Sequence, residues 1–148
     1  MMGAAKPPLD DWAHLAPALI VRDLADSLGF WTGILGFTIG YERQEDEFVY
    51  LTSGRAHVML YQRCDAYETA ALEPPYGRGV MFQIEVENVD AVLRQLTDRR
   101  WPVYQGLREA WYRAGPVERG MRQLLVQDPD GYLIMAYTEL GVRPRIQG

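Results

Sequence analysis

The chain has 148 residues, a formal net charge of −5 and an apolar fraction of 48%. A chain of this length can bury one sizeable core, or two small modules that share one. No basic run is longer than Arg99-Arg100, which argues against a nucleic-acid partner, because binding to phosphates needs clustered Lys and Arg. We also expect no signal peptide and no membrane anchor, because the first eleven residues lack an apolar segment and no stretch approaches the ~20 apolar residues that span a membrane. The single cysteine, Cys64, excludes an intrachain disulfide, so we expect a cytoplasmic protein.

The first half of the chain predicts one strand, one helix and three further strands within residues 13–63, preceded by a tail at 1–12. Asp23 is placed to cap a helix that ends near Gly36. Residues Thr52 to Arg55 predict a tight turn between the last two strands. The expected strands are residues 16–21, 37–42, 47–51 and 56–62, and the apolar face of the helix holds Leu24, Leu28, Trp31 and Leu35.

A polar linker at 64–78 precedes a second module at 79–140, and a loose tail is expected at 141–148. Asn88 is placed to cap the second helix, which Pro102 prevents from continuing. Residues Asp128 to Gly131 predict a turn, because Pro presets φ and Gly accepts positive φ. The expected strands are residues 80–86, 103–105, 109–113, 122–127 and 132–138.

The two halves repeat one pattern at an offset of 65 residues, the spacing from Asp23 to Asn88. The repeat predicts an α+β fold of two tandem modules that enclose a cavity. Alternation along residues 80–86 places Phe82, Ile84 and Val86 on the helix side of the second sheet. It places Met81, Gln83 and Glu85 on the other face, toward the cavity.

Two sequence elements carry a resemblance to a known family. Asp23-Leu24 with Phe30-Trp31 and Leu35-Gly36-Phe37 forms the first, and Asp128-Pro129-Asp130-Gly131-Tyr132 forms the second. Together they resemble the vicinal oxygen chelate superfamily of glyoxalases, bleomycin-resistance proteins and extradiol dioxygenases. The resemblance covers about residues 15–140. It implies two βαβββ modules that form curved half-barrel sheets with helices on the convex side, and a homodimer with one ligand site per cup.

The resemblance also implies where metal-dependent relatives hold their ion. The corresponding positions here are Ala16, Leu60, Met81 and Met135. Ala and Leu have no donor atom, and a thioether is a soft ligand, so this set cannot hold a hard divalent ion. His14 and His57 are the only histidines, and neither falls on these positions. We therefore expect no metal and no cofactor.

The function expected from the resemblance is that of a metal-free binding protein of bleomycin-resistance type. It would sequester an aromatic small molecule, either a cationic antibiotic such as bleomycin or an unrelated aromatic metabolite. Rigid aromatic side chains stack on flat rings at little entropic cost, and Glu85 can pair with a cation. The expected ligand-binding residues are Tyr41, Phe48, Tyr50, Leu60, Gln62, Met81, Gln83, Glu85, Trp111, Tyr112, Arg122, Met135 and Tyr137.

Two alternatives remain open from the sequence. The first is an enzyme, either a metal-independent isomerase or hydrolase with Glu85 as a base in a partly apolar cup, or a glyoxalase- or dioxygenase-like enzyme with a non-standard or misread active site. The second is a regulatory or scaffold module, which no fused domain or charged tail favours. The sequence also leaves undecided which face of its strand Arg122 occupies, because Gln123 to Val126 break the alternation of polar and apolar residues. An ion pair from Arg122 to Glu118 or Glu85 is one structural role for it.

Overall fold

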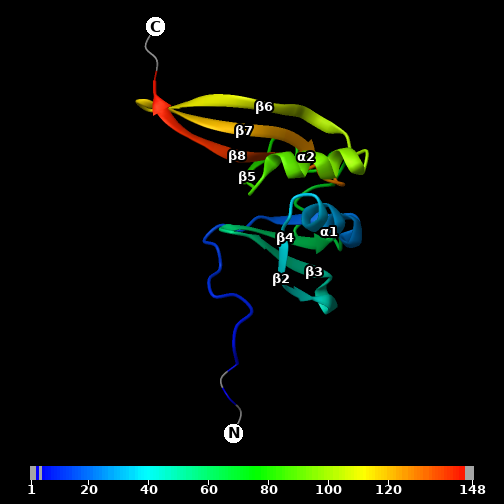
Figure 1. Ribbon diagram of the computed structural model, residues 1–148. Coiled ribbons are helices and arrows are strands. Elements are labelled where there is room, and N and C mark those ends of the chain that lie inside the picture. The colour runs from blue at the N-terminus through cyan, green and yellow to red at the C-terminus, as the bar shows by residue number, and fades with distance from the viewer. Residues whose placement is uncertain (1–2, 4, 146–148) are drawn as a thin grey trace.

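The computed structural model describes residue 3 and residues 5–145, which form two four-stranded sheets and two α-helices (Figure 1). No helix in this part of the chain is long and apolar enough to span a bilayer. The elements in chain order are β1 (Ala18–Val21), α1 (Leu24–Gly33), β2 (Thr38–Arg43), the 3₁₀ turn η1 (Gln44–Asp46), β3 (Phe48–Ser53), β4 (Ala56–Gln62), β5 (Met81–Glu85), α2 (Val89–Asp98), β6 (Val103–Ala114), β7 (Val117–Gln127) and β8 (Leu133–Pro144).

Both sheets have the same topology, with strand orders β1-β4-β3-β2 and β5-β8-β7-β6. In each sheet the first strand runs parallel to the last, and the other neighbours are antiparallel. Ala18 lies opposite Met59 in one sheet, and Gln83 lies opposite Met135 in the other. These pairings confirm the predicted α+β fold of two βαβββ modules.

Each helix begins at the acidic or amide side chain that the sequence predicts. The Asp23 carboxylate accepts a hydrogen bond from the Asp26 amide, and the Asn88 side chain accepts from the amides of Asp90 and Ala91. These contacts satisfy backbone N–H groups that have no partner within the first turn of a helix. The predicted turns also form, with positive φ at Gly54 and Gly131.

A single hydrophobic core joins the two modules. It contains Phe30 and Trp31 from α1, Val89 and Leu96 from α2, and inward side chains of both sheets. Trp31 is completely buried, as expected for the apolar face of its helix. Because both sheets turn their helix-covered sides toward this core, the opposite side of each sheet points away from it. We call these opposite sides the open faces.

A polar network inside the junction ties the first module to the turn before β8. Asp130 accepts hydrogen bonds from the Arg22 side chain (2.9 Å) and the Ser27 hydroxyl (3.2 Å). Asp128 accepts from the Trp31 indole at 3.2 Å and from the amides of Asp130 and Tyr132. Burial raises the pKa of the Asp128 carboxyl to about 6, although its hydrogen bonds oppose that shift.

The strands of the second module are longer than the sequence predicts. The two short strands expected at 103–105 and 109–113 are one strand, β6, and β7 begins at Val117 rather than near residue 122. β8 continues to Pro144, so the loose tail expected from Gly141 is wrong for its first four residues, where Gly141 pairs with Gly120. The ends of β6, β7 and β8 therefore extend together beyond α2 (Figure 1).

Candidate functional site

The open face of the first sheet is aromatic. The rings of Tyr41 and Tyr50 stack with centroids 5.0 Å apart and an interplanar angle of 13°. The ring centroids of Phe48 and Tyr61 are 4.6 Å apart, and the Arg43 guanidinium lies 3.9 Å from the ring centroid of Phe48. Phe48 and Tyr50 are almost fully buried. The predicted residues Tyr41, Phe48 and Tyr50 thus lie together on one surface.

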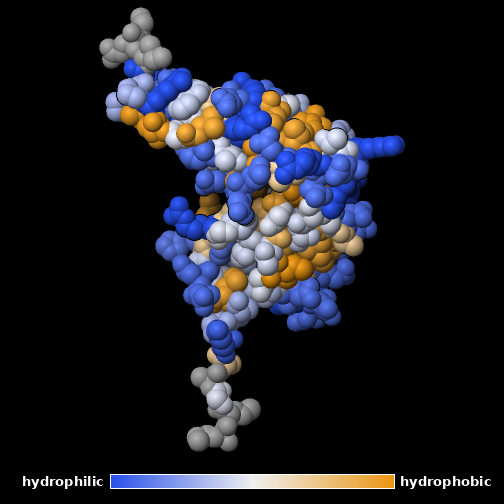
Figure 2. Space-filling model, viewed as in Figure 1, coloured by the Kyte–Doolittle hydropathy of each residue, from blue (hydrophilic) through white to orange (hydrophobic). Residues whose placement is uncertain are grey.

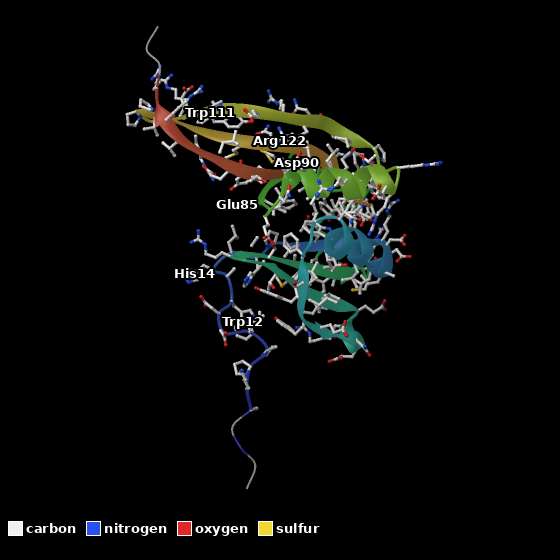
Figure 3. The ribbon with its side chains drawn as sticks, in the orientation of Figure 1. Trp12, His14, Glu85, Asp90, Trp111 and Arg122 are labelled. Atoms are coloured by element: carbon white, nitrogen blue, oxygen red, sulfur yellow. The ribbon has the colours of Figure 1, made fainter. Side chains whose placement is uncertain are left out.

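The segment before β1 lies against this aromatic face. The Trp12 indole donates a hydrogen bond to the Tyr41 hydroxyl (3.3 Å), and the Ala13 amide donates to Nδ1 of His57 (3.0 Å). The Tyr50 hydroxyl lies 2.7 Å from the same His57 nitrogen. Figure 3 shows Trp12 and His14 on this segment, which runs beside the first sheet. Residues described as a tail from the sequence therefore cover part of the predicted site.

The open face of the second sheet is built from β5, β8, β7 and β6, and β6 contributes Arg108, Ala110 and Tyr112. Met81, Gln83 and Glu85 are exposed along β5, as the alternation predicts, and Ile84 is buried on the helix side. Met135 and Tyr137 on β8 are buried on the open face, where they lie opposite Leu125 and Gln123 of β7. The apolar part of this face comprises Met121, Leu125, Met135 and Tyr137.

One buried amide lies in the middle of this second open face. Gln123 is 1% exposed, and its Oε1 accepts a hydrogen bond from the Tyr112 hydroxyl at 2.7 Å. Its Nε2 has no hydrogen-bond partner among the described residues. Nearby, Arg119 donates to the Tyr137 hydroxyl and forms an ion pair with Glu139. These two acceptors raise the pKa of the Arg119 guanidinium.

A cleft of about 530 Å³ separates the two modules where β5 ends (Figure 2). Glu85, Glu87 and Glu139 line it from the second module, and Arg55 and the turn between β3 and β4 line it from the first. Figure 3 shows Glu85 at the end of β5, beside this gap. Glu139 is already paired with Arg119, so Glu85 and Glu87 supply the remaining negative charge of the cleft.

Leu60 and Gln62 lie away from the open face of the first sheet. Leu60 is fully buried in the core on the helix side, and Met59 occupies the adjacent position on the open face. The Gln62 amide caps the start of α1, because its Oε1 accepts from the Leu24 amide and its Nε2 donates to the Arg22 carbonyl. The prediction that Leu60 and Gln62 lie in the cup is out of register by one residue along β4. A shift of one residue moves each side chain to the opposite face of the sheet.

Trp111 and Tyr112 lie on opposite faces of β6. The Tyr112 hydroxyl reaches Gln123 on the open face. Trp111 instead packs directly over Gly120, where an added Cβ would come within 2.7 Å of the indole. The Arg143 guanidinium lies 4.0 Å from the ring centroid on Trp111. The structure therefore does not bring Trp111 onto the second open face, and its surroundings are those of a packing residue.

Arg122 points toward α2 and forms an ion pair with Asp90 (2.9 Å), as Figure 3 shows. The expected partners, Glu118 and Glu85, are wrong: Glu118 pairs with Arg143, and Glu85 lies on the other face of the sheet. The Arg122 guanidinium lowers the pKa of the Asp90 carboxyl. Arg122 therefore supports the start of the second helix and is not on the open face.

The residues at the family's metal positions do not form a site for a hard ion. Ala16 and Met81 carry no oxygen or nitrogen donor in their side chains, and Met135 faces Gln83 and Leu125. With Met59 in place of Leu60, the set still offers only thioethers. Across residues 3 and 5–145, no three His, Cys, Asp or Glu side chains gather in a way that could hold a metal ion.

Three features of the site lie outside the predictions made from the sequence. The sequence predicts that Trp12 lies in a tail, although an aromatic residue near a predicted first strand is itself a signal of packing. To place Met59 on the open face, the register of β4 must be known. To place Gln123 there, one must know which residues of β7 share a face, and the hydrophobic alternation of β7 is broken. A buried amide without a partner has no signature in the sequence, because it depends on contacts made by other strands.

Comparison with solved structures gives the same fold at low sequence identity. TioX from Micromonospora sp. ML1 is 21% identical, with a TM-score of 0.64 over 86% of this chain and 99% of its own. Lactoylglutathione lyase from Agrobacterium tumefaciens is 19% identical, with a TM-score of 0.54 over 88% of this chain and 96% of its own.

Sequence comparison identifies the family. The family model described as Glyoxalase/Bleomycin resistance protein/Dioxygenase superfamily matches residues 12–136. This chain belongs to the glyoxalase/bleomycin resistance protein/dioxygenase superfamily.

Proposed function

We propose that this protein binds and sequesters an aromatic small molecule of antibiotic type, without a metal ion. The observation that carries the proposal is the aromatic open face of the first sheet, where four rings and one guanidinium lie in contact. Flat heterocycles stack on such a surface, and each aromatic side chain loses little entropy when it binds. The donor-poor metal positions favour binding over metal-assisted chemistry.

An aromatic group already lies on this face. Trp12 contacts Tyr41 edge to face, with centroids 6.2 Å apart and a hydrogen bond between the two side chains. Because the covering segment comes from outside the sheet, a ligand ring can take the place of the indole. The face therefore accommodates an indole-sized ring without rearrangement of β2, β3 or β4.

Glu85 favours a ligand with a positive charge. Its side chain is exposed and lines the cleft of about 530 Å³ between the modules. The cleft contains two carboxylates that have no ion-pair partner among the described residues, Glu85 and Glu87, against one guanidinium, Arg55, so a cation would meet a net negative charge there. A ligand with an aromatic part and a cationic tail, as in bleomycin, matches these two features.

The binding cup is proposed to form in a homodimer. Within one chain the space between the modules is filled by the shared core, so the two open faces cannot meet. In a pair of chains, the first open face of one protomer can lie against the second open face of its partner, which gives two cups. Sedimentation equilibrium should then give twice the chain mass of 16.9 kDa.

The experiment is a calorimetric titration of metal-free protein with bleomycin, compared with the Glu85→Gln variant. We expect submicromolar binding at one drug per chain, and weaker binding by the variant, because it keeps the shape of the side chain and removes its charge. The control is Glu42→Gln, which neutralises an exposed carboxylate on β2 away from the cleft and should bind as the wild type does.

Two results would count against the proposal. Stoichiometric metal in the purified protein would favour the enzyme alternative, because it would require donors other than those at the family positions. No detectable heat with bleomycin at several temperatures would leave the family intact and exclude this drug as the ligand.

A further inference from the structure

We propose that Gln123 is a ligand-reading residue on the second open face and that it donates a hydrogen bond to a neutral acceptor on the bound molecule. The inference rests on the proposed binding function and adds the ligand class: a flat aromatic molecule that carries a carbonyl oxygen or a heteroaromatic nitrogen. Nothing in the sequence pattern or the family positions assigns this role to Gln123.

The first observation is the cost of the unpartnered amide. Gln123 is 1% exposed, and its Nε2 has no hydrogen-bond partner among the described residues. A buried donor without a partner loses the full free energy of its hydration, about 1–3 kcal/mol. Buried polar groups in folded proteins are almost always paired, so this amide is held in a state that a suitable acceptor would relieve.

The second observation is the surroundings of the amide. Gln123 lies between Tyr137 of β8 and the exposed Arg108 of β6, its direct neighbours across the sheet, and Met121 and Leu125 flank it on the same face of β7. A buried polar group with apolar neighbours is common in small-molecule sites, where it fixes the orientation of the ligand. It also rejects analogues that lack the matching atom, because they leave the amide unpaired.

The third observation is that a hydrogen bond holds the amide in one orientation. Tyr112 donates its hydroxyl to Oε1 at 2.7 Å and is itself 37% exposed. The bond orients the amide so that Nε2 is the free atom. Tyr112 thus positions Gln123 with its donor directed to a ligand.

The test uses three aromatic probes that differ in one polar feature. Quinoline presents a ring-nitrogen acceptor, naphthalene presents none, and indole presents an N–H donor. Binding is measured by two-dimensional ¹H–¹⁵N NMR of the wild-type protein. The side-chain amide signals of Gln123 are assigned by their loss in Gln123→Met, which has a side chain of similar length and no polar group. Gln95→Met, on the exposed side of α2, is the matched control.

We expect quinoline to bind at least about fivefold more tightly than naphthalene, the ratio that one net hydrogen bond supplies. One Gln123 amide proton should shift downfield only with quinoline. Gln123→Met should lose the preference and keep its affinity for naphthalene, whereas Gln95→Met should behave as the wild type.

The opposing results separate this inference from the proposed function. Equal affinity of the wild type for quinoline and naphthalene would overturn the role of Gln123 and leave aromatic binding standing. A preference for indole would show that the amide presents its oxygen, which also overturns the proposal. If the Gln123 signals shift with protein concentration in the absence of a probe, a second copy of the chain accepts the hydrogen bond from Nε2. That result would overturn the ligand-binding role of Gln123. If no probe binds, both the inference and the proposed aromatic binding fail.

Discussion

The buried carboxyl of Asp128 should make the stability of this protein fall as pH rises from 4 to 7. Asp128 is 3% exposed, and its pKa is raised from 3.8 to about 6, chiefly by burial. In this window the folded state keeps a proton that the unfolded chain releases. Stability therefore decreases with rising pH, because it rises only where the unfolded state binds more protons.

The size of the effect follows from the shift in pKa. About two pKa units at about 1.4 kcal/mol each give about 3 kcal/mol in total. About 2 kcal/mol of this total falls between pH 4.5 and 7.5, because the unfolded carboxyl has already begun to titrate at the lower limit.

Asp128→Asn is the perturbation that isolates this effect. The variant cannot ionise, and its Oδ1 can still accept from the amides of Asp130 and Tyr132. Its Nδ2 faces the Trp31 indole N–H, so that hydrogen bond is lost at a cost of about 1–3 kcal/mol. The wild type should therefore be more stable near pH 4.5, and its advantage should shrink by about 2 kcal/mol by pH 7.5.

Urea denaturation of both proteins across this pH range measures the difference in the free energy of unfolding. A ¹³C titration of the Asp128 carboxyl would give its pKa directly, with about 6 expected. An advantage that stays constant with pH, or that grows toward neutral pH, would refute the reasoning. It would mean that the hydrogen bonds to the carboxylate, rather than its burial, set the pKa.

Three further predictions concern side chains whose roles the structure changes. Trp111→Ala should lower the free energy of unfolding by about 2 kcal/mol, roughly half the cost for a fully buried aromatic, with bleomycin affinity unchanged; reduced affinity at unchanged stability would return Trp111 to the site. Arg122→Ala should return the pKa of the Asp90 carboxyl upward toward its ordinary value, as followed by carboxyl NMR, and an unmoved pKa would show that the ion pair is not populated. Trp12→Ala should speed hydrogen exchange of the Ala13 amide, because the segment loses its contact with Tyr41; an unchanged rate would mean that His57 alone holds the segment.

The locally determined parts of the fold could be predicted. Asp23 and Asn88 cap the two helices where the sequence places them, because an N-cap depends on only the next few residues. The alternation along β5 correctly separates Ile84 from Gln83, because consecutive side chains of a strand point to opposite faces. The repeat at 65 residues correctly predicts two modules of one topology.

The site depended on the phase of each strand, which the sequence defined less well. Register shifts interrupt the pairing of β6 with β7 between Gln105 and Arg108, and of β7 with β8 between Gly120 and Met121. Such irregularities change which residues share a face. For β7 the broken alternation left the phase open, and only the pairing shows that Gln123 lies on the open face and Arg122 beside α2.

The sequence by itself determined the family, the two modules, the helix caps and the lack of metal donors at the family positions, because each of these depends on residue identity and short spacing. Tertiary structure alone decided what covers each face. It placed Trp12 on the aromatic sheet, paired Arg122 with Asp90, and left the Gln123 amide without a partner among the described residues. These contacts join segments 29 or more residues apart in the first two cases. They depend on how the sheets curve and pack together, which no local pattern specifies.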